Sequence, residues 1–148
     1  MIAIQPRKAV FLDLDGVLTT ARTRFVEFDP ETVSHLNALV RDDVGFVLSS
    51  SWRGLLPLAD LTDMLRLAGF RGEVSDQTPY IRNVERGVEI AAWLKAHPEV
   101  GDFVILDDDA DMGELVSHLV QTDSASGLQA ADVERAMGIL NEEALAHA

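Results

Sequence analysis

The sequence of 148 residues contains no cysteine, and this absence removes several kinds of chemistry. Disulfide bonds, zinc sites built on thiolates and catalysis by a thiol nucleophile are all excluded. Proteins that do without disulfides are typical of reducing compartments, so we expect a cytoplasmic protein.

Basic residues and long apolar runs are also scarce. Lysine and arginine number 12 against 25 aspartates and glutamates, which gives a formal net charge of −13. A protein whose main task is to grip a nucleic-acid backbone is usually basic, so a polyanionic substrate would have to be met here by local positive charge or by a metal. No apolar run approaches the roughly 20 residues of a membrane span, and neither membrane association nor a signal peptide is expected.

Apolar segments alternate with segments of helical spacing along the chain. This alternation predicts an α/β fold with a doubly wound parallel sheet of about five strands, and the length fits a single domain over residues 1–148. The predicted strands are 9–14, 44–48, 71–75, 103–106 and 119–122. The predicted helices start at Pro30 after an Asp29 N-cap and then cover 55–68, 84–96, 112–118 and 130–146, with a loop at 19–28 and a turn at 76–79.

Two acids follow the first predicted strand one residue apart. Side chains two apart on a strand share a face, so Asp13 and Asp15 are expected to point the same way, and Gly16 allows a backbone conformation that a side chain opposes. Two carboxylates at the carboxyl end of a buried strand repel each other unless a cation lies between them. A hard divalent cation such as Mg²⁺ is the natural candidate.

Two further predicted strands also end in polar side chains. Ser49 and Ser50 follow the second strand, and Asp107 and Asp108 follow the apolar run that begins at Phe103. Because the carboxyl ends of parallel strands lie on one edge of a sheet, these groups are expected to converge with the first acid pair.

This combination resembles the haloacid dehalogenase (HAD) superfamily of phosphohydrolases. Its first motif matches residues 13–17 (DLDGV), its second the apolar strand 44–49 that ends in Ser49, and its fourth the apolar strand 103–108 that ends in two acids. The third motif, a basic residue before the helix that leads to the fourth, is assigned to Arg86, with Arg82 and Lys95 as alternatives. Residues 50–53, 106–112 and 122–128 look like the small HAD domains of bacterial and phage Swiss Army Knife RNA-repair proteins.

The resemblance implies a role for each matching residue and a three-layer α/β/α fold. It implies Asp13 as the nucleophile that becomes an aspartyl-phosphate and Asp15 as the acid and base. Mg²⁺ would be held by the Asp13 carboxylate, the Asp15 carbonyl and Asp108. The remaining roles are water orientation by Asp107, a phosphoryl contact from Ser49, charge neutralisation by Arg86, and substrate binding by Ser50 and Arg53.

Structural roles compete with several of these assignments. Asp107 and Asp108 could cap a helix, Asp111 could lie in a solvated first turn or touch the metal, and Ser50 could cap the following helix. Trp52 is expected to pack, although it could stack on a base, and Arg53 could simply pair with an acid.

The spacing between the motifs leaves no room for a cap domain, so an open site suited to a large substrate such as an RNA or DNA end is expected. A phosphatase of nucleotides or small metabolites, and a non-catalytic phospho-receiver module that binds Mg²⁺, are the alternative functions. The sequence identifies no stable protein partner.

Overall fold

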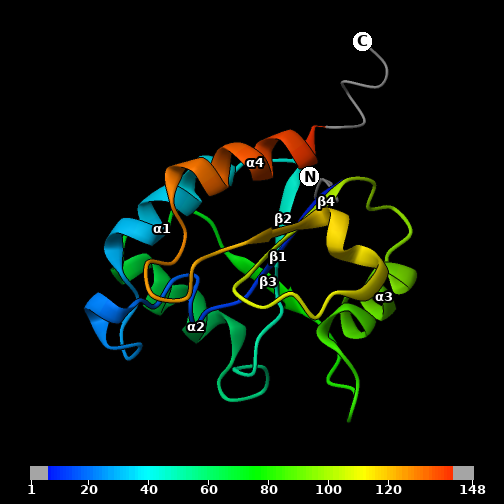
Figure 1. Cartoon of the computed structure of the whole chain (residues 1–148), viewed down its shortest axis with the longest axis horizontal. Coiled ribbons are helices and arrows are strands. Elements are labelled where there is room, and N and C mark those ends of the chain that lie inside the picture. The colour runs from blue at the N-terminus through cyan, green and yellow to red at the C-terminus, as the bar shows by residue number, and fades with distance from the viewer. Residues whose placement is uncertain (1–6, 142–148) are drawn as a thin grey trace.

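Residues 7–141 are described by the computed structural model, and they form a parallel sheet covered by helices on both faces (Figure 1). The sheet has five strands in the order β3-β2-β1-β4-β5, and every neighbouring pair is parallel. The strands are β1 (Lys8–Leu12), β2 (Val44–Leu48), β3 (Val74–Gln77), β4 (Phe103–Asp107) and β5 (Leu119–Gln121). The predicted doubly wound α/β fold is confirmed.

The helices divide between the two faces according to the alternation of side chains on β1. Val10 and Leu12 pack in one core with residues of α1, α2 and α4, whereas Ala9 and Phe11 pack in a second core with residues of α3. The helices are α1 (Pro30–Leu36), α2 (Leu58–Leu67), α3 (Arg86–Ala96) and α4 (Ala130–Leu140), with 3₁₀ turns η1 (Ala21–Thr23), η2 (Asn37–Leu39) and η3 (Gly113–His118). Three layers result, as the resemblance implied.

Helix starts follow the capping residues. The side chain of Asp29 accepts a hydrogen bond from the N–H of Glu31 at 3.0 Å, and Pro30 occupies the first helical position, as predicted. The second predicted helix begins three residues later than expected, at Leu58, because Pro57 has an extended ψ of 145° and stands at the N-cap. The predicted end of the last helix lies outside the described residues beyond Asn141.

The third strand is the main departure from the predicted pattern. It covers Val74–Gln77 instead of 71–75, so the turn predicted at 76–79 was wrong for its first two residues. Two features explain this shift. The N–H of Val74 is held by the hydroxyl of Thr62 on α2 at 3.0 Å, and β3 is an edge strand, where polar residues such as Asp76 can face solvent.

No helix among residues 7–141 is long and apolar enough to cross a membrane.

Candidate active site

Asp13 is the first residue beyond β1, and the backbone of the neighbouring strand fixes its position. Its N–H donates to the carbonyl of Leu106 on β4 at 3.0 Å, and its Oδ1 accepts from the N–H of Leu14 at 2.9 Å. The residue is 8% exposed. A carboxylate is thus held at the carboxyl edge of the sheet, next to the end of β4, with little access to water.

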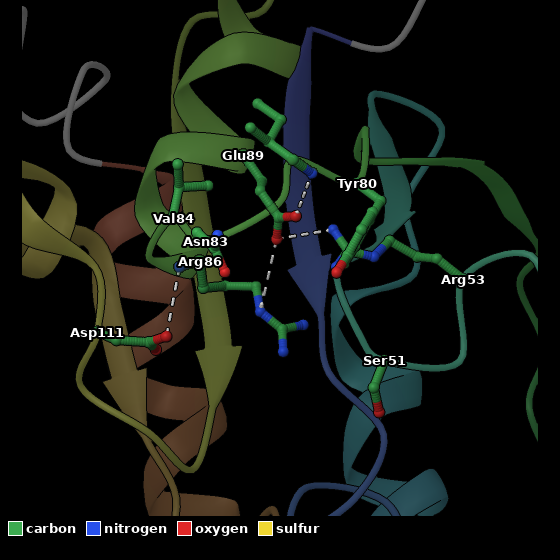
Figure 2. Close-up of a pocket in the computed structure, with 9 residues that line it drawn as sticks. Ser51, Arg53, Tyr80, Asn83, Val84, Arg86, Glu89 and Asp111 are labelled. Atoms are coloured by element: carbon green, nitrogen blue, oxygen red, sulfur yellow. Dashed lines mark hydrogen bonds and ion pairs between the residues drawn. The ribbon is translucent and has the colours of Figure 1, made fainter.

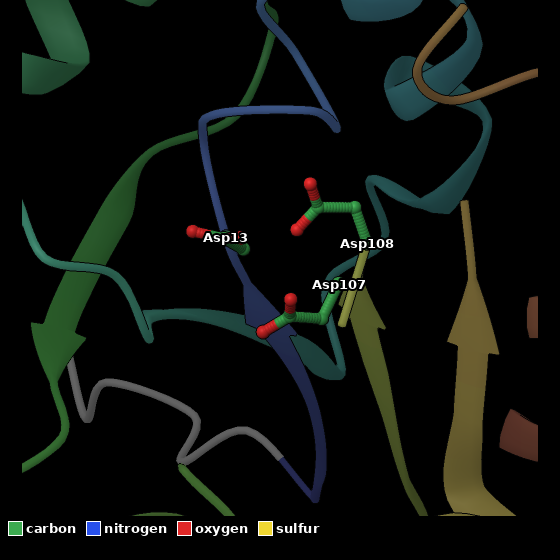
Figure 3. Close-up of side chains that lie close together, drawn as sticks. All are labelled: Asp13, Asp107 and Asp108. Atoms are coloured by element: carbon green, nitrogen blue, oxygen red, sulfur yellow. The ribbon is translucent and has the colours of Figure 1, made fainter. Parts of the chain in front are cut away.

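The end of β4 brings two more acids to the same point (Figure 3). Asp107 is the last residue of the strand and is buried, and its Oδ1 accepts from the N–H of Asp109 at 2.9 Å. Asp13, Asp107 and Asp108 each offer a carboxylate oxygen, and these oxygens lie within 4.8 Å of one another. The predicted convergence of the strands that carry these acids is therefore present in the fold.

Burial and repulsion between the carboxylates raise the pKa values of two acids in this cluster. Burial raises the pKa of Asp13, and the N–H of Leu14 and the positive charge of Arg86 oppose that rise. Burial also raises the pKa of Asp107, and the charge of Asp13 raises it further. A divalent cation would relieve both effects, and three hard carboxylate oxygens are the ligand type that Mg²⁺ prefers. The residues present therefore fit a magnesium ion.

Asp15 has different surroundings from Asp13. Because β1 ends at Leu12, both acids lie beyond the strand, and the strand alternation from which a shared face was predicted does not apply to them. Asp15 is exposed, its Oδ1 accepts from the hydroxyl of Thr19 at 3.2 Å, and its Oδ2 accepts from the indole N–H of Trp52 at 3.2 Å. Its exposed carboxylate is thus held from two sides, outside the group formed by Asp13, Asp107 and Asp108.

Ser49 and Arg86 each have a buried polar atom that lacks a hydrogen-bond partner within the described part of the chain. Ser49 directly follows β2, and its N–H donates to the carbonyl of Leu12 at 2.9 Å. Arg86 is the first residue of α3, and its positive charge opposes part of the rise in the pKa of Asp13 and of Asp107. The buried atoms Ser49 Oγ and Arg86 Nη1 have no hydrogen-bond partner among residues 7–141. Buried polar atoms are normally satisfied, so these two are candidates for contacts with a bound anion.

Ser50 and Arg53, which were predicted to bind substrate, both lie in the turn after β2. Ser50 is fully buried, and its hydroxyl accepts from the N–H of Trp52 at 3.2 Å, which places Ser50 inside the turn instead of at its surface. Arg53 forms an ion pair with Glu89 at 2.8 Å and lies beside Arg86 on the wall of a pocket of about 300 Å³ (Figure 2).

The two alternative basic residues for the third motif are Arg82 and Lys95. Arg82 is an exposed loop residue, and Lys95 lies near the far end of α3. Asp111 accepts a hydrogen bond from the N–H of Arg86 at 3.3 Å, so its carboxylate caps the start of α3 and lies outside the group of three clustered acids.

Sequence reasoning missed two residues that contact the site. Glu89 was not singled out, although an acid three residues after Arg86 on a helix faces the same way. Trp52 was expected to pack or to stack on a base, and its role as a hydrogen-bond donor to Asp15 has no signal in the sequence.

Comparison with known proteins agrees with this geometry. No curated protein and no solved structure matches the chain. A protein family described as the HAD domain in Swiss Army Knife RNA repair proteins matches residues 9–133, which span β1 to β5 and the start of α4. The chain therefore belongs to this family of HAD domains.

Proposed function

We propose that the chain is a Mg²⁺-dependent phosphatase that removes a phosphate from a nucleic-acid end through an aspartyl-phosphate on Asp13. One observation carries this proposal: the carboxylates of Asp13, Asp107 and Asp108 cluster at the sheet edge that also presents the charge of Arg86. Membership of the HAD family supports a phosphohydrolase in general, and the cluster supports this form of the reaction.

The metal would be held at the acid cluster. We assign the Asp13 carboxylate, the Asp15 carbonyl and Asp108 as ligands, with Asp107 orienting the groups around them. When bound, Mg²⁺ would supply positive charge against the negative charge of the phosphoryl oxygens.

Asp13 and Asp15 carry the covalent chemistry of the proposal. The Asp13 carboxylate attacks phosphorus, a new O–P bond forms, and the bond from phosphorus to the leaving oxygen breaks. Asp15 gives a proton to that leaving oxygen and later takes one from the water that hydrolyses the acyl phosphate. The hydrogen bonds from Thr19 and Trp52 support this role, because they hold the Asp15 carboxylate in one place two residues after Asp13.

Fixed donors complete the binding of the phosphoryl group. Ser49 Oγ and Arg86 Nη1 donate to its oxygens, which accounts for their lack of partners within residues 7–141. Arg53 contributes positive charge on the pocket wall, and Ser50 maintains the turn that presents both Ser49 and Trp52.

The architecture between the motifs favours a large substrate. Only η1, α1 and η2 lie between Asp15 and β2, and only α2 and β3 lie between Arg53 and α3. Neither insertion forms a separate lid, so a nucleic-acid end could approach, while water is poorly excluded around a small substrate.

Phosphate release from several substrates tests the proposal. We expect a higher kcat/KM for an oligonucleotide with a 3′- or 5′-phosphate than for sugar phosphates, with MgCl₂ required and EDTA abolishing turnover. Faster turnover of a sugar phosphate than of either oligonucleotide would refute the substrate class, and full turnover in EDTA would refute the metal dependence.

A further inference from the structure

Glu89 is a buried acid that lies between the two arginines of the pocket (Figure 2). Its side chain is 5% exposed. Its Oε1 lies 2.8 Å from Nη1 of Arg53 and 4.0 Å from Nε of Arg86, and its Oε2 accepts from the N–H of Ile81 at 2.8 Å. A buried carboxylate is unfavourable unless it is paired, and here one carboxylate serves two cations and a backbone donor.

Arg53 is held in place by further hydrogen bonds besides its ion pair with Glu89. Nη1 of Arg53 also donates to the hydroxyl of Thr78 at 2.9 Å and to the carbonyl of Pro79 at 3.2 Å. Arg53 is therefore tied to the segment that follows β3, and its ion pair ties Glu89 to the same frame. Arg86 has no comparable set of anchors for its guanidinium among the described residues, where Glu89 is its ion-pair partner.

Glu89 cannot neutralise both arginines, so positive charge on Arg86 remains to act on the acid cluster. Two guanidinium groups share one carboxylate, so one positive charge remains uncompensated within this group. Nη1 of Arg86 is buried and has no hydrogen-bond partner among residues 7–141, so this nitrogen remains free to donate to a bound phosphoryl group. An arginine side chain has many rotamers, and a partner that is itself fixed, as Glu89 is by Arg53 and Ile81, restricts the guanidinium to fewer of them.

We propose that Glu89 is a positioning residue, which holds Arg86 toward the phosphoryl group at Asp13 by anchoring it to the frame of Arg53. The inference rests on the proposed phosphatase function and adds to it a residue that touches neither substrate nor metal. It predicts that Glu89 acts through Arg86 and has no effect when Arg86 is absent.

A double-mutant cycle measures this dependence, with p-nitrophenyl phosphate and MgCl₂ as the assay. Glu89→Gln should lower kcat/KM by roughly tenfold and should weaken inhibition by inorganic phosphate, because a poorly held Arg86 binds phosphoryl oxygens less well. In an Arg86→Ala background, the same Glu89→Gln change should lower kcat/KM by less than about twofold. A merely structural role would lower the melting temperature in both backgrounds and would not make the kinetic effect depend on Arg86.

Two more variants test whether activity depends on the position of the Glu89 carboxylate, on its charge or on folding. Glu89→Asp retains the charge but shortens the side chain, so it should fold and still lose roughly the same activity as Glu89→Gln. The matched control is Glu85→Gln, which removes one negative charge at the exposed N-cap of α3 and should retain wild-type kinetics.

The outcomes distinguish this inference from the proposed function. Wild-type kinetics in Glu89→Gln, or an equal loss in the presence and absence of Arg86, would overturn the positioning role while the phosphatase function stands. Absence of turnover in the wild-type protein would overturn the function, and the positioning role with it.

Discussion

Gly16 and Asp108 approach so closely that no side chain fits between them. A Cβ on residue 16 would lie 2.2 Å from Oδ2 of Asp108, and Gly16 has a φ of +78°, where residues other than glycine are strained. The hydroxyl of Thr122 donates to the carbonyl of Gly16 at 2.7 Å and holds the loop against the end of β5. The absence of a side chain at Gly16 thus leaves room for Asp108 to lie in the acid cluster with Asp13 and Asp107.

Gly16→Ala should therefore displace Asp108 and weaken Mg²⁺ binding at the proposed site. We expect kcat/KM to fall by at least roughly tenfold, and the free energy of unfolding to fall by about 1–3 kcal/mol because of the strained φ. Gly138→Ala is the control, since a Cβ there meets nothing within 4 Å among residues 7–141, and it should retain activity and lose no stability. Kinetics and urea unfolding of both variants provide the measurement. Equal activity in the two variants would show that the close approach has no functional role.

Mg²⁺ should raise the melting temperature of the wild-type protein, because it binds the folded acid cluster and not the unfolded chain. Asp108→Ala should reduce that increase more than Asp111→Ala, since Asp108 is part of the cluster and Asp111 accepts from the N–H of Arg86. Thermal melts at several MgCl₂ concentrations measure both effects. If the two substitutions reduce the increase equally, the assignment of Asp108 as a ligand is wrong.

Without metal, stability should increase as the pH falls from about 8 toward about 4. Burial raises the pKa of Asp13 to about 6 and that of Asp107 to about 8, both well above the ordinary value of an aspartate. The folded protein therefore binds more protons than the unfolded chain over this range, and protonation favours the folded state. Asp29 and Asp123 have lowered pKa values and act in the opposite direction only under more acidic conditions.

Melts of the EDTA-treated protein at several pH values test this expectation. We expect a midpoint higher by about 4 °C at pH 5 than at pH 8, the shift that about 1 kcal/mol produces in a domain of this size. Asp107→Asn should remove most of the difference. A midpoint that falls steadily from pH 8 to pH 5 would contradict the raised pKa values.

Arg86 should be the basic residue that completes the site. Arg86→Ala should lower kcat/KM by at least roughly tenfold, about 1.4 kcal/mol of transition-state stabilisation. Arg82→Ala and Lys95→Ala are the controls and should be near neutral, because Arg82 is an exposed loop residue and Lys95 lies near the far end of α3. Steady-state kinetics of the three variants decide the assignment. Wild-type kinetics in Arg86→Ala together with a loss in either control would transfer the role to that control residue.

The sequence predicted the parts of the site that strand ends determine. Buried apolar runs mark β1, β2 and β4, and in a parallel sheet their carboxyl ends must meet, so the meeting of Asp13 with Asp107 and Asp108 could be inferred. The position of β3 could not, because its register depends on a tertiary hydrogen bond from Val74 to Thr62.

Contacts between side chains of distant elements were also beyond prediction from the sequence. The surroundings of Asp15 depend on Trp52, 37 residues later, and those of Arg86 depend on how α3 packs beside the turn that holds Arg53. Periodicity shows which face of an element is buried, but it does not show which partner lies opposite a given polar atom.

Phosphate release by purified Asp13→Asn protein shows whether Asp13 is the nucleophile of the proposed reaction. An amide is a far poorer nucleophile than a carboxylate, so we expect no turnover above buffer with the best oligonucleotide substrate and MgCl₂. The variant should remain folded by circular dichroism, since the change removes a buried negative charge from a repulsive cluster. Asp15→Asn should lose most of its turnover under the same conditions, because only proton transfer is affected. Wild-type turnover by folded Asp13→Asn protein would show that Asp13 is not the nucleophile.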